Sequence, residues 1–317
     1  MSNQRKKVVV IGGGHGQSTI LRGIKNIDDI DITAIVTVAD DGGSTGRLRQ
    51  RFDIPAMGDI RNVLISLAES ESLLSTLMEY RFEGTDNNDE DVMGHNLGNL
   101  ILTAMTQTCG SFMESIATLS KVLRVKGQII PATLQVITLY AIMEDGTIVC
   151  GEHNIPNISN RIRQVYYHEL VRALPAAVKA IHEADYIIYG IGSIYTSILP
   201  NLIIPEICET VHESQAKIIY FCNAMTQPGE TDDYTLEDHV QAFYDHGTKV
   251  DLVVRANNII PNKIIEKYKL EGSIPVIVNK SSHPYMIQEV DLLSFDEELI
   301  RHNPIKIKKC FENILKG

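Results

Sequence analysis

Short apolar runs that end in glycine or polar residues recur along the chain and predict buried strands. The first covers residues 7–11, and the second, residues 32–38, is rich in β-branched side chains. Further runs lie at residues 186–189, 217–221 and 251–254. They lack the alternation of apolar and polar positions that marks a half-exposed strand. Continuous apolar runs of this length are typical of parallel strands covered on both faces.

Between these runs the apolar positions recur every three or four residues, which is the spacing of amphipathic helices. The segments with this spacing are residues 18–25, 61–69, 73–81, 95–108, 111–123 and 176–183. Strand, turn, helix and strand in this order predict right-handed βαβ units. We therefore expect an α/β fold: a Rossmann-like, doubly wound, mostly parallel sheet with helices on both faces.

One part of the chain departs from this alternation. Residues 139–150 have the pattern of a β-hairpin that turns at Asp145 and Gly146, so a small β-hairpin excursion from the sheet is expected. Residues 84–91 are polar and predict a solvated loop. No repeat or Pro/Gly/Ser-rich linker divides the chain, and residues 1–317 are expected to form one domain. A separate insertion at residues 125–170 is the alternative.

Composition narrows the class of protein. The chain has 29 Lys and Arg against 40 Asp and Glu, and its net charge of −11 argues against nucleic-acid binding, which depends on clustered cations. No stretch reaches about 18 apolar residues, so we expect neither a signal peptide nor a membrane span. Five scattered cysteines without a C-x-x-C pair favour reduced thiols in a cytoplasmic protein.

The loop after the first strand has the composition of a phosphate-binding turn. Glycine lets backbone N–H groups approach an anion, and the helix that follows presents its positive end. The dinucleotide fingerprint is incomplete, because Gln17 stands at its third glycine, and the Walker pattern is absent. A purely structural turn is the alternative. The candidate phosphate-binding residues are Gly12, Gly13, Gly14, His15, Gly16 and Ser18.

Two adjacent carboxylates, Asp40 and Asp41, follow the second strand. They lie at the edge where ligands bind in open α/β sheets. Such a pair suits ribose hydroxyls or Mg²⁺, which prefers a few carboxylates together with phosphate oxygens. We therefore treat both as candidate catalytic and metal-binding residues. Turn formation or capping of the next helix is the alternative.

Polar residues also stand where two later helices are expected to begin. Asp59 is a candidate cap. His95 and Asn99 are one helical turn apart and would share a face, although a structural role for His95 is the alternative. The candidate ligand contacts in these loops are Arg61, Asn62, His95, Asn96 and Asn99.

The strands in the second half of the chain end in polar loops as well. Gly192 and Ser193 form a second glycine-containing turn, and Asn223 follows the next strand. The nucleophile pattern G-x-S-x-G is absent, so a hydrolase is not indicated. Ser193 and Thr196 could donate hydrogen bonds to an anion or cap a helix. Gly192, Ser193 and Asn223 complete the set of candidate nucleotide-binding residues.

Together these loops resemble the bacterial gluconeogenesis factor (YvcK-like) family, which is related to the 2-phospho-L-lactate transferases of coenzyme F420 synthesis. The resemblance covers residues 7–300 and is carried by residues 12–16, 37–48, 58–62, 94–100, 192–202 and 223–231. His15 departs from the threonine expected in most members. Ile191 stands between Gly190 and Gly192, where many members have proline.

The resemblance implies a nucleotide-binding cytoplasmic protein needed for growth and cell morphogenesis, that is, normal cell shape, on gluconeogenic carbon sources. It implies a UDP-sugar as the ligand, with its phosphates lined by the two glycine turns. An NAD-like dinucleotide is an alternative ligand. Regulatory protein partners and a homo-oligomer are expected.

The transferase relatives imply a second function. The chain would then be a Mg²⁺-dependent phosphoryl or nucleotidyl transferase, with Asp40 and Asp41 at the metal site. The sequence leaves open whether a reaction is catalysed.

Overall fold

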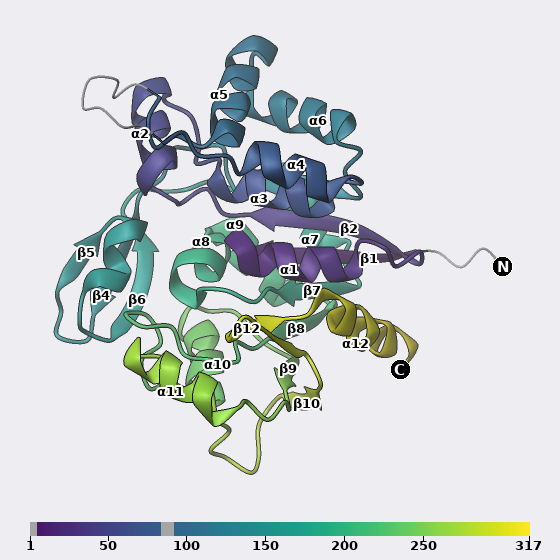
Figure 1. The fold of residues 1–317 in the computed structure, drawn as a ribbon, viewed down its shortest axis with the longest axis vertical. Helices are drawn as coiled ribbons and strands as arrows, with labels where there is room; N and C mark the ends of the chain where they lie inside the picture. The colour runs from purple at the N-terminus through teal and green to yellow at the C-terminus, as the bar shows by residue number, and fades with distance from the viewer. Residues whose placement is uncertain (1–4, 84–91) are drawn as a thin grey trace.

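A seven-stranded parallel sheet forms the centre of the protein (Figure 1). The computed structural model describes residues 5–83 and 92–317. The strand order is β10-β9-β8-β7-β1-β2-β3, and every neighbouring pair is parallel. The strands are β1 (Lys6–Gly12), β2 (Ile30–Val36), β3 (Gln128–Pro131), β7 (Tyr186–Tyr189), β8 (Lys217–Phe221), β9 (Leu252–Ala256) and β10 (Met286–Val290). The predicted Rossmann-like α/β fold is confirmed.

The inner strands are apolar on both sides because helices cover both faces of the sheet. Four successive residues of β1, Val8 to Ile11, are each at most 1% exposed. On one face α1 (Gly14–Ile24) lies between α3 (Gly58–Leu67) and α12 (Pro304–Lys316). The other face carries α7 (Pro175–His182), α9 (Pro205–Glu213) and α10 (Leu236–Asp245), with Phe243 packed on Tyr189 and Tyr220.

Close contact between α1 and α12 depends on a glycine. A Cβ atom at Gly23 would lie 2.8 Å from Ile307 Cγ2 and 2.9 Å from the Pro304 carbonyl oxygen. Asn303 caps α12 by accepting hydrogen bonds from the N–H groups of its first turn, and Pro304 supplies the fixed φ that favours a helix start. The sequence therefore fixes where the last helix begins and how near it approaches the first.

The connection between β2 and β3 adds a group of helices, drawn at the top of Figure 1. Apart from α3, its helices are α2 (Gly43–Phe52), α4 (Glu71–Met78), α5 (Leu97–Cys109) and α6 (Phe112–Val122). The helix predicted from residue 95 begins two residues later, because Asn96 is its N-cap and accepts a hydrogen bond from the Asn99 N–H. The predicted loop at residues 84–91 lies outside the described residues.

The excursion from the main sheet is a three-stranded antiparallel sheet, the small sheet, of β4 (Leu139–Met143), β5 (Ile148–Cys150) and β6 (Ile162–Tyr167). The hairpin turns at Asp145 and Gly146 as predicted, with Gly146 at a φ of 88°. β6 was not predicted. The 3₁₀ helix η1 (Glu152–Asn157) follows β5. The small sheet lies within residues 125–170, but β3 belongs to the main sheet.

The remaining elements follow the later strands. They are the π-helical turn η2 (Ile194–Ile198), α8 (Leu199–Leu202), α11 (Asn262–Leu270), and a hairpin of β11 (Leu293–Asp296) and β12 (Leu299–His302). Across the ranges described above, no helix has the length and apolar character needed to cross a membrane.

A buried histidine ties the small sheet to α10. His246 Nε2 accepts a hydrogen bond from the Val165 N–H at 3.0 Å, and its Nδ1 lies 2.7 Å from the Ala242 carbonyl oxygen. Because Nε2 accepts, the proton of the neutral ring is on Nδ1. Burial lowers the pKa of His246, which favours this neutral form.

Replacing His246 with Leu leaves the Val165 N–H unpaired, and we expect the free energy of unfolding at pH 7.5 to fall by about 1–3 kcal/mol. Because the pKa of His246 is lower in the folded state, the stability it contributes is present above the unfolded pKa and is lost at lower pH. The difference between wild type and variant should therefore shrink below about pH 6.5. Urea denaturation at pH 7.5 and 5.5 measures it. Leu at the exposed His182 is the control, and a difference that grows on acidification contradicts this account.

Candidate functional site

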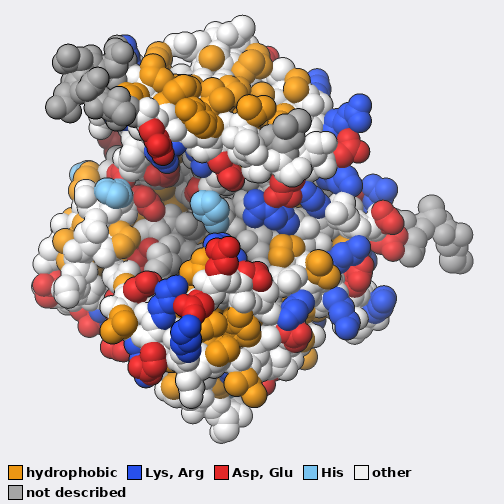
Figure 2. Space-filling model, viewed as in Figure 1, with side chains coloured by type: hydrophobic (Ala, Val, Ile, Leu, Met, Phe, Trp, Pro, Cys, Tyr) orange, Lys and Arg blue, Asp and Glu red, His pale blue; other side chains and the backbone are white. Residues whose placement is uncertain are grey.

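The two glycine turns meet where the strand order of the sheet reverses. The chain builds outward from β1 in one direction and from β7 in the other, and ligands bind at the carboxyl ends of such strands. The turn after β1 and the turn after β7 are in contact: a Cβ atom on Gly16 would lie 1.8 Å from the Ile191 carbonyl oxygen. Figure 2 shows a hollow on this face, surrounded by acidic side chains and histidines. We call this hollow the cleft.

The N-termini of four helices converge on the cleft. α1 begins in the first glycine turn, and α3 begins beside α2, since a Cβ atom on Gly58 would lie 2.9 Å from Thr45 Oγ1. The start of α5 is joined to α2 by a hydrogen bond from Asn99 Nδ2 to Ser44 Oγ at 3.2 Å. Helix N-termini carry unpaired N–H groups and partial positive charge, so this arrangement favours an anion.

The predicted residues around His95 hold these helix starts together. His95 Nδ1 lies 3.0 Å from Ser44 Oγ, and the Asn96 N–H donates to the same hydroxyl. All three predicted residues, His95, Asn96 and Asn99, are at most 5% exposed. Burial lowers the pKa of His95, and Arg47 lowers it further. The observed contacts of these three residues are therefore with the start of α2.

Arg61 belongs to the same network. Its guanidinium donates to Asn99 Oδ1 at 2.9 Å and to Asn62 Oδ1 at 2.8 Å, while Nε is buried without a partner among the described residues. Burial is the main cause that lowers the pKa of Arg61. The positive charge at the start of α3 is thus held in a fixed position by two of the predicted amides.

The sequence suggested that Asp40 and Asp41 act as a pair, but their side chains have different partners. Asp41 turns toward the small sheet, where its Oδ1 accepts the His153 N–H at 3.0 Å. Asp40 accepts the Gly42 N–H at 3.0 Å, and its other oxygen would lie 2.8 Å from a Cβ atom on Gly58. Asp40 is therefore next to Asp59, the second residue of α3.

Asp59 does not cap α3; Met57 is at that position, with no side-chain cap. The Asp59 carboxyl reaches the first glycine turn instead. It accepts a hydrogen bond from the Gly14 N–H, and a Cβ atom on Gly13 would lie 2.3 Å from its Oδ2. Burial, followed by the charge of Asp40, raises the pKa of Asp59 to about 7.

Glu152, the first residue of η1, is a further acidic group that sequence reasoning missed. The residues on either side of it are both held at Asp41: the His153 N–H donates to that carboxylate, and Gly151 lies against it. Burial raises the pKa of Glu152 to about 8, assisted by Asp40 and Asp59. No sequence pattern marks Glu152, because the small sheet brings it to the cleft from far along the chain.

The acidic groups fit Mg²⁺ only together with a ligand. In the part of the chain that is described, no group of three or more His, Cys, Asp or Glu side chains is arranged to hold a metal ion. The charges of Asp40 and Asp59 interact, and Mg²⁺ commonly takes one or two carboxylates plus phosphate oxygens. These two residues would hold the ion, which would neutralise phosphate charge.

The second glycine turn is braced by polar side chains from the next strand. Asn223 Oδ1 accepts the Gly192 N–H at 3.1 Å, and its Nδ2 donates to the Gly192 carbonyl oxygen at 3.0 Å. Ser193 and Thr196 both donate their hydroxyl hydrogens to Glu230. The loop after β8 therefore holds this turn through both its backbone and its hydroxyl groups.

The side chains after the first glycine turn face different ways. Gln17 is fully buried, and its Nε2 donates to the carbonyl oxygens of Val10 and Ile35, each at 2.9 Å, so it bridges β1 and β2. Ser18 is 1% exposed, and its hydroxyl has no partner among the described residues. His15 reaches the surface, where Arg61, Arg22 and Arg301 add to the effect of desolvation in lowering its pKa.

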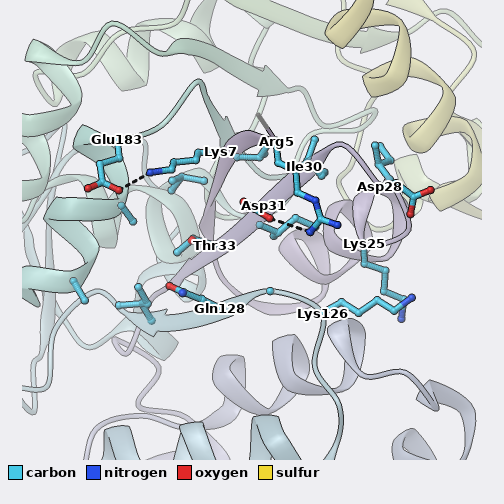
Figure 3. A pocket seen from close by; sticks show the side chains of 18 of the residues that line it. Arg5, Lys7, Lys25, Asp28, Ile30, Asp31, Thr33, Lys126, Gln128 and Glu183 are labelled. Atoms are coloured by element: carbon cyan, nitrogen blue, oxygen red, sulfur yellow. Dashed lines mark hydrogen bonds and ion pairs between the residues drawn. The ribbon is translucent and has the colours of Figure 1, made fainter. Parts of the chain in front are cut away.

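A cavity of about 1000 Å³ lies at the opposite edge of the sheet, at the amino ends of β1, β2 and β3 (Figure 3). Two of its basic side chains already have acidic partners: Lys7 pairs with Glu183 at 2.7 Å and Arg5 with Asp31 at 3.3 Å. The glycine turns and helix N-termini are at the other edge, so the candidate site remains the cleft.

Known proteins are similar to this chain over most of its length. The family described as 2-phospho-L-lactate transferase CofD matches residues 8–293. The chain belongs to this CofD family. It is 45% identical to the gluconeogenesis factor of Bacillus subtilis, with 99% of each chain covered. It is 40% identical to the putative gluconeogenesis factor of Thermotoga maritima, covering 97% of this chain and 99% of that one.

A solved structure shows the same fold. The crystal structure of a UPF0052 family protein from Bacillus halodurans has a TM-score of 0.90 and 44% identity, and the match covers 96% of this chain and 99% of that one. The family resemblance predicted from six sequence segments is thus confirmed. The CofD-family match includes both glycine turns and the Asp40–Asp59 pair.

Replacing Asp59 with Asn tests the buried carboxyl. The folded-state pKa of about 7 lies above the usual value, so ionisation of Asp59 costs folding stability as pH rises through that range. Asn cannot ionise, and the variant should gain more than about 1 kcal/mol relative to wild type between pH 5 and pH 8. Denaturant unfolding at both values measures this gain. Asp28→Asn at the exposed surface is the matched control, and an equal gain there would refute the assignment.

Proposed function

We propose that this protein binds a nucleotide sugar, specifically a UDP-sugar, in the cleft. The observation that carries the proposal is the convergence of four helix N-termini and two glycine turns at the point where the strand order reverses. Backbone N–H groups can bind a diphosphate even though the net charge of the chain is −11. Arg61 adds a cation held in a fixed position.

The proposed biological role is that of a gluconeogenesis factor, as its relatives are named. In this role, ligand occupancy of the cleft would be communicated to regulatory protein partners in the cytoplasm, in support of growth and cell shape on gluconeogenic carbon sources. We further propose that it acts as a homo-oligomer. An NAD-like ligand is less suited to the first turn, because Gln17 fills the position of the third fingerprint glycine and bridges two strands.

A second function, Mg²⁺-dependent phosphoryl or nucleotidyl transfer, is favoured by a separate observation. The charges of Asp40 and Asp59 interact beside the first glycine turn, and the description of the family names a transferase. Such reactions rely mainly on positioning and on neutralising charge on the transferred group. Asp40 and Asp59 would hold the metal, while Arg61 and the helix N-termini would stabilise phosphate oxygens.

Binding is tested with two variants that differ only in charge. Gly14 has a φ of 59°, which Asn and Asp both tolerate, and a Cβ atom there makes only ordinary contact with Asp59. Gly14→Asp places a negative charge in the turn, and we expect its affinity for UDP-glucose to fall roughly tenfold or more below that of Gly14→Asn. Isothermal titration calorimetry measures the affinities, and thermal melting confirms folding. Equal affinity in the two variants, or no binding by wild type, would refute the proposal.

Transfer is tested by following UDP-glucose with phosphorus NMR in the presence of Mg²⁺ and of lactate as an acceptor. If the protein is a transferase acting on this donor, new phosphorus signals appear with wild type and disappear with Asp40→Asn or with EDTA. Asp53→Asn, outside the cleft, is the control and should react as wild type does. Tight binding without any new signal favours the binding role.

A further inference from the structure

We propose that Glu230 is the positioning residue of the second glycine turn: its buried carboxyl holds the Ser193 and Thr196 hydroxyls and so fixes the conformation of the turn. Glu230 lies in the loop after β8 and is 2% exposed. One of its oxygens, Oε1, accepts three hydrogen bonds. The donors are Ser193 Oγ at 2.8 Å, Thr196 Oγ1 at 3.0 Å and Gln227 Nε2 at 2.7 Å.

The direction of these bonds determines what the turn can offer. A hydroxyl has one hydrogen, and Ser193 gives it to Glu230 while accepting from Gln227 Nε2 at 2.5 Å. Thr196 likewise donates to Glu230. Neither hydroxyl is left to donate to a phosphate, so each anchors the start of η2 to the loop after β8.

Glu230 and Asn223 thus hold the turn from two sides. Asn223 pairs with both the N–H and the carbonyl of Gly192, and Glu230 holds the next residue and Thr196. Gly192 has a φ of 137°, which residues other than glycine rarely adopt. This backbone conformation is held by the hydrogen bonds of Asn223 and Glu230. Two strands therefore cooperate to form one binding turn.

The bonding pattern also predicts which substitutions are tolerated. Oε1 of Glu230 accepts all three side-chain bonds, and the N–H groups of Tyr195 and Thr196 also point to the carboxyl. Gln at this position can place its amide oxygen at Oε1 and keep the three side-chain bonds. Ala removes all three acceptor contacts, and Asp withdraws the carboxyl by one methylene group. A positioning role therefore predicts rescue by Gln, whereas a role that depends on negative charge does not.

Ligand affinities provide one test, which rests on the proposed function. Calorimetry with UDP-glucose, UDP and uridine should show that Glu230→Ala lowers affinity for the two phosphate-bearing ligands roughly tenfold and leaves uridine unchanged. Glu230→Gln should remain within about twofold of wild type. A Gln variant as weak as the Ala variant, or an equal loss for uridine, would overturn the proposal.

Amide hydrogen exchange provides a second test that needs no ligand. Exchange at residues 192–196 should be faster in Glu230→Ala than in wild type and unchanged in Glu230→Gln. Asp232→Asn, an exposed carboxylate in the same loop, is the matched control and should leave these amides unchanged. Unchanged exchange in Glu230→Ala would overturn the inference. If the Ala variant does not fold, Glu230→Asp gives the same comparison.

The two tests separate the inference from the proposed function. If wild type binds neither UDP-glucose nor UDP, the proposed ligand is wrong, and the exchange data alone decide the role of Glu230. If wild type binds both and the Ala variant binds as tightly, the proposed function stands and the positioning role is wrong.

Discussion

The structure depends on the contact between the two glycine turns at the centre of the sheet. Gly16 approaches the Ile191 carbonyl so closely that no side chain fits between them. This contact joins the β1 half of the sheet to the β7 half at the point where a ligand is expected to enter. The buried strands beneath it, at most 1% exposed along β1, provide the rigid base on which both turns rest.

The cleft combines two chemical surfaces of opposite charge. Helix N-termini and Arg61 attract anions, while Asp40, Asp59 and Glu152 add acidic groups next to them. Burial, followed by the charges of neighbouring carboxylates, raises the pKa values of Asp59 and Glu152. A ligand that carries phosphates together with a divalent cation is complementary to both surfaces, because the phosphates face the cationic groups and the metal ion faces the carboxylates. Ionisation of the buried carboxyls of Asp59 and Glu152 therefore lowers the stability of the fold as pH rises through their pKa values.

The sequence was sufficient to predict the strands and most helices, because apolar runs and glycine turns are local signals. It also predicted the hairpin at Asp145. That the site lies at the carboxyl ends of the strands stays a prediction. The sequence did not predict that Asp40 pairs with Asp59, or that Glu152 and Glu230 reach the cleft. These contacts join residues far apart in the chain and depend on how the elements pack. Likewise, the polarity of Ser193 indicated a hydrogen bond but could not identify its acceptor.

The packing of α12 on α1 bears on how the protein is made. Gly23 lies under Ile307 and Pro304, so the helix that begins in the first glycine turn is completed on its outer side by residues synthesised nearly three hundred positions later. A nascent chain can pair β1 with β2 early, but it leaves this side of α1 exposed to solvent until α12 emerges. The first helix is thus among the last parts of the molecule to become fully packed during synthesis.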